Sequence, residues 1–382
     1  MALKKPHLIL DVGPLLDDQW TGIPVFTRRL AQALLRDGRL DVQFSIDQVR
    51  IPSSDVLAAI QTASGAALRD ALNRATTGSG TKISRHSHLL FPSVKKSCGA
   101  TLHEASTVHD MSTLFMPENH SEANVVHHIE PLRAELDSDE VVFCASEATQ
   151  AAVITAFPSV SAKTRVLYQY VDWPEEFPAF ERNLPALRLG RYAVVVGTIE
   201  PRKNLALLLN ALTVKEVARS ELKFVVIGRK GWLMDEFLAK LAPLQRERVA
   251  FTGYVSEFTK YRLLKHAEFL IYPSLYEGFG IPALEAMSLG KPVLAARTSS
   301  FPEVIGEAGV FFDPLSVVEF AAAFAEIQGR QKRSALEAKA IAQSAQFGWR
   351  RMALPVVEWV MGKGVDVRRS ISAVTPPTTK SA

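Results

Sequence analysis

The sequence PSLYEGFGIPALEAM occupies positions 273–287, directly after the apolar run Phe269–Tyr272. The apolar run predicts a buried strand, and Pro282 suits the first residue of a helix because the N–H that it lacks has no helical partner there. Between the two, the bare backbone at Gly278 and Gly280 lets a ligand approach closely. The free N–H groups and the positive dipole end of the helix suit a phosphate. The stretch therefore predicts a strand, a glycine loop and a helix that bind an anion.

Two acids, Glu277 and Glu285, lie eight positions apart, the first in the loop and the second about one turn into the helix. Taken alone, Glu277 also fits a solvated loop, and Glu285 also fits the start of a helix, where the helix dipole favours an acid. At a phosphate site two carboxylates would repel the ligand, unless they accept hydrogen bonds from hydroxyl groups on either side of it. A sugar on one side and a ribose on the other would supply those hydroxyls.

Strands and helices alternate along the chain. The strand Leu8–Gly13 leads through a polar loop into a helix over about Val25–Leu35, and a second series of apolar strands begins at Tyr192. Strands this apolar, spaced by helical patterns, predict parallel sheets that are buried on both faces. The segment 172–188, rich in proline and acids, predicts a linker between two domains. We expect a helix around 121–136 and strands at Glu140–Ala145, Arg165–Val171, Tyr192–Gly197, Phe224–Gly228, Val249–Phe251, Phe269–Tyr272, Pro292–Ala296 and Val310–Phe312.

The composition is that of a globular protein. The chain has 382 residues, of which 47% are apolar and 22% charged, and its net charge of +4 is too weak to indicate nucleic-acid binding. The two cysteines, Cys98 and Cys144, exclude a disulfide scaffold and a cysteine-rich zinc site and favour a reducing compartment. No uncharged apolar run reaches about 18 residues, and the N-terminus predicts a strand rather than a signal peptide. We therefore expect a cytoplasmic protein.

Glu277 and Glu285 match the E-x7-E motif, and other blocks stand in the matching order around them. In the second half these blocks are GTIEPRKN at 197–204, FTGYVS at 251–256 and PEV at 302–304, and in the first half they are TGIP at 21–24 and VHD at 108–110. On these motifs the chain resembles the retaining glycosyltransferases of family 4. Those proteins have the α/β GT-B fold, in which two Rossmann-like domains face each other across a cleft. The GTIEPRKN block is similar to that of the mannosyltransferase-like branch.

The resemblance implies a role for each matching position. Glu277 would hold hydroxyls of the donor sugar, and Glu285 would bind the ribose. From the first half, Gly22 would approach the diphosphate and His109 would sit by the reacting sugar. The sugar and the diphosphate would be lined by the backbone of Gly278, Phe279, Gly280 and Ile281.

When a glycosyl–phosphate bond breaks, negative charge grows on the leaving nucleoside diphosphate. A cation must stabilise that charge. Arg202 and Lys203 directly follow a predicted strand and Pro201, so their loop faces the cleft at the carboxyl ends of the strands. The resemblance assigns both to the diphosphate. Many family members carry arginine immediately after the glycine at 197, where this chain has Thr198. Either Arg202 takes over that charge or the site has one cation fewer.

The implied reaction is transfer of a hexose from a nucleoside-diphosphate sugar to a hydroxyl of a saccharide or lipid-linked saccharide, with retention. The form of the GTIEPRKN block favours mannose as the transferred sugar and GDP-mannose as the donor. The leaving phosphate helps to accept the acceptor's proton, so we expect no side-chain nucleophile, no cofactor and no metal to be required. The alternatives are a non-catalytic nucleotide-sugar-binding protein, which Thr198 keeps open, and a nucleotide-sugar epimerase of the same fold.

The implied domains are an acceptor-side domain over 1–185 and a nucleotide-sugar-binding domain over 186–345. The last helix, within 346–366, would cross back onto the first domain, and the polar tail 367–382 predicts disorder. From 71 to 103 the chain has several basic residues and no acid. This stretch fits either a solvated loop or a surface for an anionic acceptor or lipid head groups, which would add a peripheral membrane contact.

Three competing patterns are weaker. The D-x-D sequence at 137–139 serves metal-dependent glycosyltransferases of another fold, but here it precedes a strand and predicts a polar turn. The G-x-G-x-x-A sequence at 278–283 fits a dinucleotide site, but the acid expected about 20 residues later is missing. We expect no metal site at four histidines, because no carboxylate or cysteine spacing completes one around His86, His88, His127 and His128.

Overall fold

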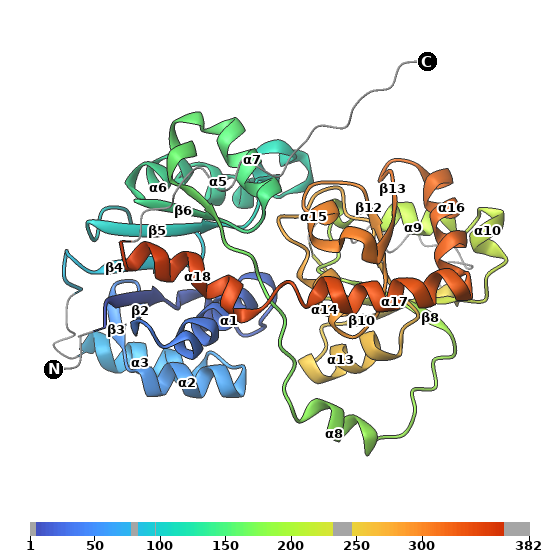
Figure 1. Cartoon of the computed structure of the whole chain (residues 1–382), viewed down its shortest axis with the longest axis horizontal. Helices are drawn as coiled ribbons and strands as arrows, with labels where there is room; N and C mark the ends of the chain where they lie inside the picture. Colours follow the sequence, from blue (N-terminus) through green and yellow to red (C-terminus); the bar gives the residue numbers. More distant parts are fainter. Residues whose placement is uncertain (1–4, 78–82, 96, 232–246, 363–382) are drawn as a thin grey trace.

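The computed structural model describes residues 5–77, 83–95, 97–231 and 247–362. Two α/β lobes lie side by side, and each is built on one sheet with helices packed around it (Figure 1). This arrangement is the GT-B architecture expected from the sequence. The tail 367–382, for which the sequence predicts disorder, lies outside the described residues.

Within the described residues, seven strands form the sheet of the first lobe in the order β3-β2-β1-β4-β5-β6-β7. All neighbours pair in parallel except β2 and β3, which form an antiparallel hairpin. At its turn Asp47 and Gln48 have φ angles of 50° and 65°, the left-handed conformation of two-residue hairpin turns. The strands are β1 (His7–Asp11), β2 (Asp41–Ile46), β3 (Val49–Ile51), β4 (His88–Phe91), β5 (His103–Val108), β6 (Val141–Cys144) and β7 (Thr164–Val166).

The helices of the first lobe connect these strands. The helix predicted after the first strand is α1, which begins at Gly22 and ends where Gly38 takes a φ of 70°. The helical stretch predicted around 121–136 is confirmed, but it consists of two shorter helices, α5 and α6, separated at Pro131. The helices are α1 (Gly22–Asp37), α2 (Ser53–Thr62), α3 (Ala66–Thr77), α4 (Ser112–Phe115), α5 (Glu122–Ile129), α6 (Leu132–Ser138) and α7 (Glu147–Ala156).

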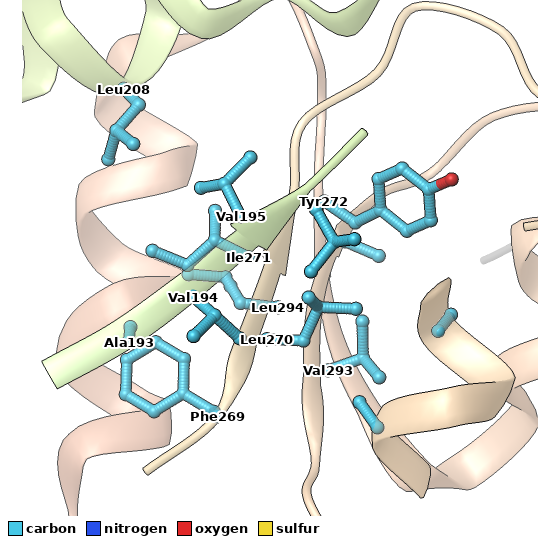
Figure 2. Close-up of a cluster of buried hydrophobic side chains, with 14 of the residues drawn as sticks. Ala193, Val194, Val195, Leu208, Phe269, Leu270, Ile271, Tyr272, Val293 and Leu294 are labelled. Atoms are coloured by element: carbon cyan, nitrogen blue, oxygen red, sulfur yellow. The ribbon is translucent and has the colours of Figure 1, made fainter. Parts of the chain in front are cut away.

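The second lobe contains all of the strands predicted for it, each within two residues of the expected bounds. They form one parallel sheet in the order β10-β9-β8-β11-β12-β13. Figure 2 shows its centre, where apolar side chains of β8, β11 and β12 pack together beneath Leu208 of α9. The strands are β8 (Tyr192–Val196), β9 (Lys223–Ile227), β10 (Val249–Gly253), β11 (Leu270–Tyr272), β12 (Val293–Ala296) and β13 (Gly309–Phe312).

The helices of the second lobe that lie within the described residues connect its strands, and α17 is the last of them. They are α9 (Leu205–Ala211), α10 (Lys215–Ala218), α13 (Glu257–His266), α14 (Ile281–Ser288), α15 (Phe301–Ile305), α16 (Val317–Gln328) and α17 (Arg330–Ser344). Short 3-10 helices occur at η1 (Gly13–Leu16), η2 (Pro117–Asn119), η3 (Pro158–Lys163), η4 (Pro201–Lys203) and η5 (Gly306–Ala308).

The segment 172–188, predicted as a linker, runs from the first lobe to the second and contains the short helix α8 (Phe177–Arg182). This helix packs on α13, where the ring centroids of Phe177 and Phe258 lie 5.1 Å apart. Lys265 Nζ lies 2.8 Å from Glu181 Oε2 in the same contact. The connection between the lobes is therefore fixed to the second one.

The last helix, α18 (Trp349–Val360), returns to the first lobe and lies beside α1 (Figure 1). Its apolar face joins the core that α1, β1 and β2 form, with Met352 and Val356 fully buried. Arg36 of α1 stacks over the Trp349 ring at 4.9 Å from its centroid. None of the helices in the described residues has both the length and the apolar character needed to cross a bilayer.

Candidate active site

A cleft of about 640 Å³ lies between the two lobes. Its volume is typical of small-molecule sites, and it opens at the carboxyl ends of β5, β8 and β11, where parallel sheets usually bind ligands. All of the site residues predicted from the sequence line this cleft: Gly22, His109, Arg202, Lys203, Glu277, Gly278, Phe279, Gly280, Ile281 and Glu285.

Lys203 and Glu277 meet in the cleft although they come from different strand ends. Lys203 Nζ lies 2.5 Å from Glu277 Oε1. Burial alone would raise the pKa of Glu277, but Lys203 and Arg202 together hold that pKa below its usual value. Glu277 is therefore ionised at neutral pH, and its carboxylate can accept hydrogen bonds from a hydroxylated ligand.

Backbone contacts hold the turn that carries Lys203 against the loop after β11. The N–H of Leu275 donates to the carbonyl of Arg202 at 2.8 Å. Asn204 ends the turn with a φ of 52°, and its Nδ2 donates to the carbonyl of Pro273 at 3.1 Å and to that of Pro314 at 2.8 Å. Both neighbours of Lys203 are thus held, Arg202 through its carbonyl and Asn204 through its side chain.

Arg202 is largely buried and binds acceptors of the protein itself. Its Nη1 lies 2.7 Å from the carbonyl O of Tyr276 and 3.3 Å from Glu277 Oε2, and its Nη2 lies 2.8 Å from Glu200 Oε1. Burial alone would lower the pKa of Arg202, but Glu277, Asp110 and Glu200 hold it above its usual value. The guanidinium is arranged to position the Glu277 carboxylate. This geometry disfavours the idea that Arg202 replaces the charge missing at Thr198.

The fold itself requires both glycines of the loop, which also line the cleft. A Cβ added to Gly278 would overlap the carbonyl oxygen of His109. Thr149 Oγ1 donates to the carbonyls of Gly278 and His109 at 3.1 and 3.3 Å, so the lobes touch through their backbones here. Gly280 caps α14 with a φ of 95°, and the helix begins at Ile281, one residue before the predicted start.

Glu285 lies at the buried end of the cleft, in contact with cations from both lobes. Its Oε1 accepts hydrogen bonds from Lys260 Nζ of α13 at 2.8 Å and from Arg29 Nη2 of α1 at 3.1 Å. The side chains of Arg29 and Glu285 are almost completely buried. A ribose bound at this carboxylate would therefore join an existing network of hydrogen bonds.

A second ion pair joins the lobes beside the first. Arg28 binds both carboxylate oxygens of Glu257 at 2.8 and 2.6 Å. Two-point binding of this kind fixes orientation as well as distance. The sequence analysis missed Arg28 and Arg29, although two adjacent arginines inside an apolar helix pattern were the available signal.

His109 is neutral and its ring is held by the first lobe. Burial lowers the pKa of His109, and its Nε2 lies 2.6 Å from the carbonyl O of Pro92. A carbonyl can only accept, so Nε2 carries the proton. The ring also packs edge-on against Phe26, with centroids 4.6 Å apart. His109 thus borders the cleft with a fixed ring whose Nε2 is already bonded.

Two more cations line the cleft, Lys260 and Arg229. Arg229 has an exposed side chain and follows β9, the neighbour of the strand that leads to Lys203. Arg229 therefore lies at the same end of the sheet as Thr198, which follows β8. The sequence signal for Arg229 was its position directly after a predicted strand and Gly228.

The D-x-D sequence lies elsewhere. Asp139 is buried before β6, where Lys95 Nζ lies 2.5 Å from its Oδ1 and Ser106 Oγ donates to its Oδ2. Burial raises the pKa of Asp139 to about 6. Neither Asp137 nor Asp139 lines the cleft, so the sequence at 137–139 has a structural role.

Comparisons with known proteins agree with this arrangement. The family described as Glycosyl transferases group 1 matches residues 183–343, which contain both the Lys203 turn and α14. O-antigen chain mannosyltransferase B of Escherichia coli is 33% identical over 254 residues, which cover 64% of this chain and 66% of that protein. This chain belongs to the group 1 glycosyltransferases.

This glycosyltransferase has further relatives with the same kind of name. Serotype-specific mannosyltransferase WbdA of Escherichia coli is 28% identical over 238 residues, which cover 59% of this chain and 29% of that protein. The chain thus spans about two thirds of the first relative and under a third of the second. The structure of sucrose-phosphate synthase from Thermosynechococcus elongatus superposes with a TM-score of 0.67 at 17% identity, over 94% of this chain and 99% of that one. The GT-B fold is shared.

Proposed function

We propose that this glycosyltransferase moves a hexose from a nucleoside-diphosphate sugar to a hydroxyl of a saccharide or lipid-linked saccharide, with retention at the anomeric carbon. The observation that carries the proposal is the contact between Lys203 and Glu277 in front of α14. It sets a cation and an ionised carboxylate beside a helix N-terminus. The cleft around them has room for a nucleotide sugar.

In this proposal the diphosphate lies against the start of α14, where free N–H groups and the helix dipole meet its charge. Lys203 stabilises the charge that grows on the leaving diphosphate, and Arg229 supplies a second cation from the neighbouring strand end. The leaving phosphate accepts the proton of the acceptor hydroxyl. Transfer then depends on positioning and charge stabilisation, and it needs no cofactor and no metal.

The carboxylates hold the two sugars. Glu277, kept ionised by its neighbours, accepts hydrogen bonds from hydroxyls of the transferred hexose. Glu285 accepts from the ribose while Arg29 and Lys260 hold its orientation. His109 and Gly22 of the first lobe close the cleft over the reacting carbon and the diphosphate.

We propose mannose from GDP-mannose as the donor. The GTIEPRKN block and the mannosyltransferase names of both curated relatives support this choice. The name of the first relative also supports a saccharide acceptor on a growing chain. Such an acceptor, carried on a lipid, would place the protein at the cytoplasmic face of a membrane. There Arg74 and Arg85, exposed cations of the basic stretch, would contact anionic head groups, whereas Lys95 of the same stretch is buried.

Thermal shift with GDP-, UDP-, ADP- and dTDP-sugars identifies the donor, because a ligand that binds the native state raises the melting temperature. Product formation is then measured for the wild type, Glu277→Gln and Lys203→Ala. The control is Lys339→Ala, since Lys339 is an exposed lysine that pairs with Glu307. We expect kcat/KM to fall about 10²–10³-fold in both cleft variants and to stay unchanged in the control.

Equal turnover in all four proteins would overturn the proposal. Donor binding without turnover on any acceptor would favour the non-catalytic binder that Thr198 leaves open. Conversion of the donor into its epimer would favour the epimerase. Binding, transfer and epimerisation are measured separately on the same donor, so each of the three functions has its own readout.

A further inference from the structure

Two histidines and a glutamate lie close together where the strands of the first sheet begin, at the end of the sheet opposite the cleft. His88 and His103 are the first residues of β4 and β5, and Glu140 directly precedes β6. These three strands are parallel neighbours, so their amino ends lie at one edge. His109 follows the other end of β5, about 20 Å away at about 3.3 Å per residue. The cluster is therefore separate from the cleft.

The three side chains are close enough to share one ion. One ligand atom from each lies within 4.8 Å of the other two, and His103 Nδ1 lies 3.0 Å from Glu140 Oε2. His88 and His103 are register partners, and their rings stack with centroids 4.7 Å apart and planes 20° from parallel. Ligand atoms in a tetrahedral zinc site lie about 3.3 Å apart, so small side-chain rotations suffice.

The chemistry of the set favours a transition metal. Two imidazoles and one carboxylate are ligands that Zn²⁺ accepts, with a fourth position left for water. Imidazole nitrogens also suit Ni²⁺ and Cu²⁺, whereas Mg²⁺ and Ca²⁺ require sites made mainly of oxygen. All three residues are partly exposed, so an ion can enter from solvent.

The surroundings support such a site. Trp359 Nε1 of α18 donates to Glu140 Oε2 at 3.0 Å. The same indole packs edge-on against His88, with ring centroids 5.1 Å apart. Hydrogen bonds of this kind to a ligating carboxylate orient it and strengthen metal binding. The two histidines lie on neighbouring strands, which hold ligands more rigidly than loops do.

We infer that His88, His103 and Glu140 form a binding site for a divalent transition metal of the Zn²⁺ class, separate from the transfer reaction. The bound ion fastens α18 to the sheet, because Glu140 joins the ion to Trp359. The sequence analysis considered His88 only together with His86, His127 and His128. The fold joins it instead to a histidine and a glutamate that are 15 and 52 positions further along the chain.

The test uses the full chain without a histidine tag, freed of metal by a chelator and titrated with Zn²⁺ by calorimetry. We expect one ion per chain, micromolar affinity or tighter, and a higher melting temperature with Zn²⁺ than with chelator. Mg²⁺ should give neither effect. His88→Ala and His103→Ala should abolish the one-to-one binding, and Trp359→Phe should weaken it about 10-fold.

Matched controls are His86→Ala and His127→Ala, because both histidines are exposed and lie outside the cluster. Both should bind Zn²⁺ like the wild type. Melting temperatures measured in chelator show whether each variant is folded. Wild-type binding by the double variant His88→Ala/His103→Ala, or only weak binding of several ions by the wild type, would overturn the inference. These readouts do not depend on the proposed sugar transfer.

Discussion

Each lobe buries a cluster of charged side chains. The two clusters differ in how many cationic side chains contact their carboxyl groups. In the first lobe three carboxyl groups share Lys95 as a partner. Its Nζ lies 3.0 Å from Glu104 Oε2 and 2.5 Å from Asp139 Oδ1. Its backbone N–H donates to Glu135 Oε1 at 2.9 Å. In the cleft two cations, Lys203 and Arg202, both contact the carboxylate of Glu277, and Arg202 also pairs with Glu200.

The pKa directions follow this difference. Burial raises the pKa of Glu135 to about 7 and that of Asp139 to about 6. Glu277 is buried too, but its cations hold its pKa below the usual value. A buried acid that two cations contact directly, such as Glu277, thus keeps its charge, whereas burial raises the pKa of acids with fewer cationic contacts, including Glu200 beside Arg202. The first cluster is sealed in the fold, whereas the second presents its charges to a cleft.

The largest effect should come from removing the cation of the sealed cluster. Lys95→Met removes the cation that pairs with Glu104 and Asp139 in a fully buried site. This change should lower the free energy of unfolding by about 3–5 kcal/mol. Chemical denaturation measures this change. Lys339→Met, at an exposed pair, should change it by less than about 0.5 kcal/mol. A loss in Lys95→Met as small as in the control would show that the carboxyl groups do not need the lysine.

The cleft cluster should respond in activity more than in stability. In Lys203→Met, Arg202 still faces Glu277, so the loss of unfolding free energy should be well below that of Lys95→Met. The rate of transfer should nevertheless fall about 10²–10³-fold, because the cation that meets the leaving group is gone. Denaturation and turnover are measured on one preparation. Equal destabilisation by the two substitutions would remove the contrast between the clusters.

The two clusters should also differ in their response to pH. Because the folded-state pKa values of Glu135 and Asp139 are raised, the stability they contribute is present below about pH 4 and is lost as the pH rises through about 7. For Glu277, with a lowered pKa, the contribution is present above its usual pKa and is lost only in acid.

Unfolding free energies of the wild type, Glu135→Gln and Glu277→Gln between about pH 5 and pH 8 test this difference. Relative to the wild type, Glu135→Gln should gain stability as the pH rises. The difference for Glu277→Gln should stay constant over that range. A constant difference for Glu135→Gln would contradict the raised pKa.

The smallest effect concerns the ion pair that joins the lobes. Arg28→Lys keeps the charge but loses the two-point contact with Glu257, which should cost about 1 kcal/mol of unfolding free energy. Arg133→Lys is the control in the same lobe, because Arg133 and its partner Asp137 are both exposed. Thermal and chemical unfolding should separate the two variants. Equal effects would mean that the buried pair adds nothing to the contact between the lobes.

The second lobe was predictable because its information is local. The strands β8 to β13 are apolar runs set off by polar segments, and the residues around Glu277 and Lys203 occur in short contiguous blocks. The first lobe was less predictable. Its strands β2, in which apolar and polar residues alternate, and β4 were not predicted, and the strand predicted over Arg165–Val171 ends at Val166. The helix pattern around 121–136 also concealed the break at Pro131.

Buried charges were the main feature that the sequence did not reveal. Pattern analysis assigns charged residues to solvent, so Lys95, Arg28 and Arg29 did not stand out; only the fold brings their distant acids to them. Gly278 illustrates a related limit. The sequence indicated that bare backbone was needed there, but the group that approaches it is the carbonyl of His109 in the other lobe.

The return of α18 to the first lobe has a consequence for how the protein is made. The core that β1 and α1 begin is completed by Met352 and Val356, which are synthesised after the entire second lobe. Chains generally fold domain by domain as they leave the ribosome. Here the half translated first must wait, with an apolar groove uncovered, until the half translated second has emerged.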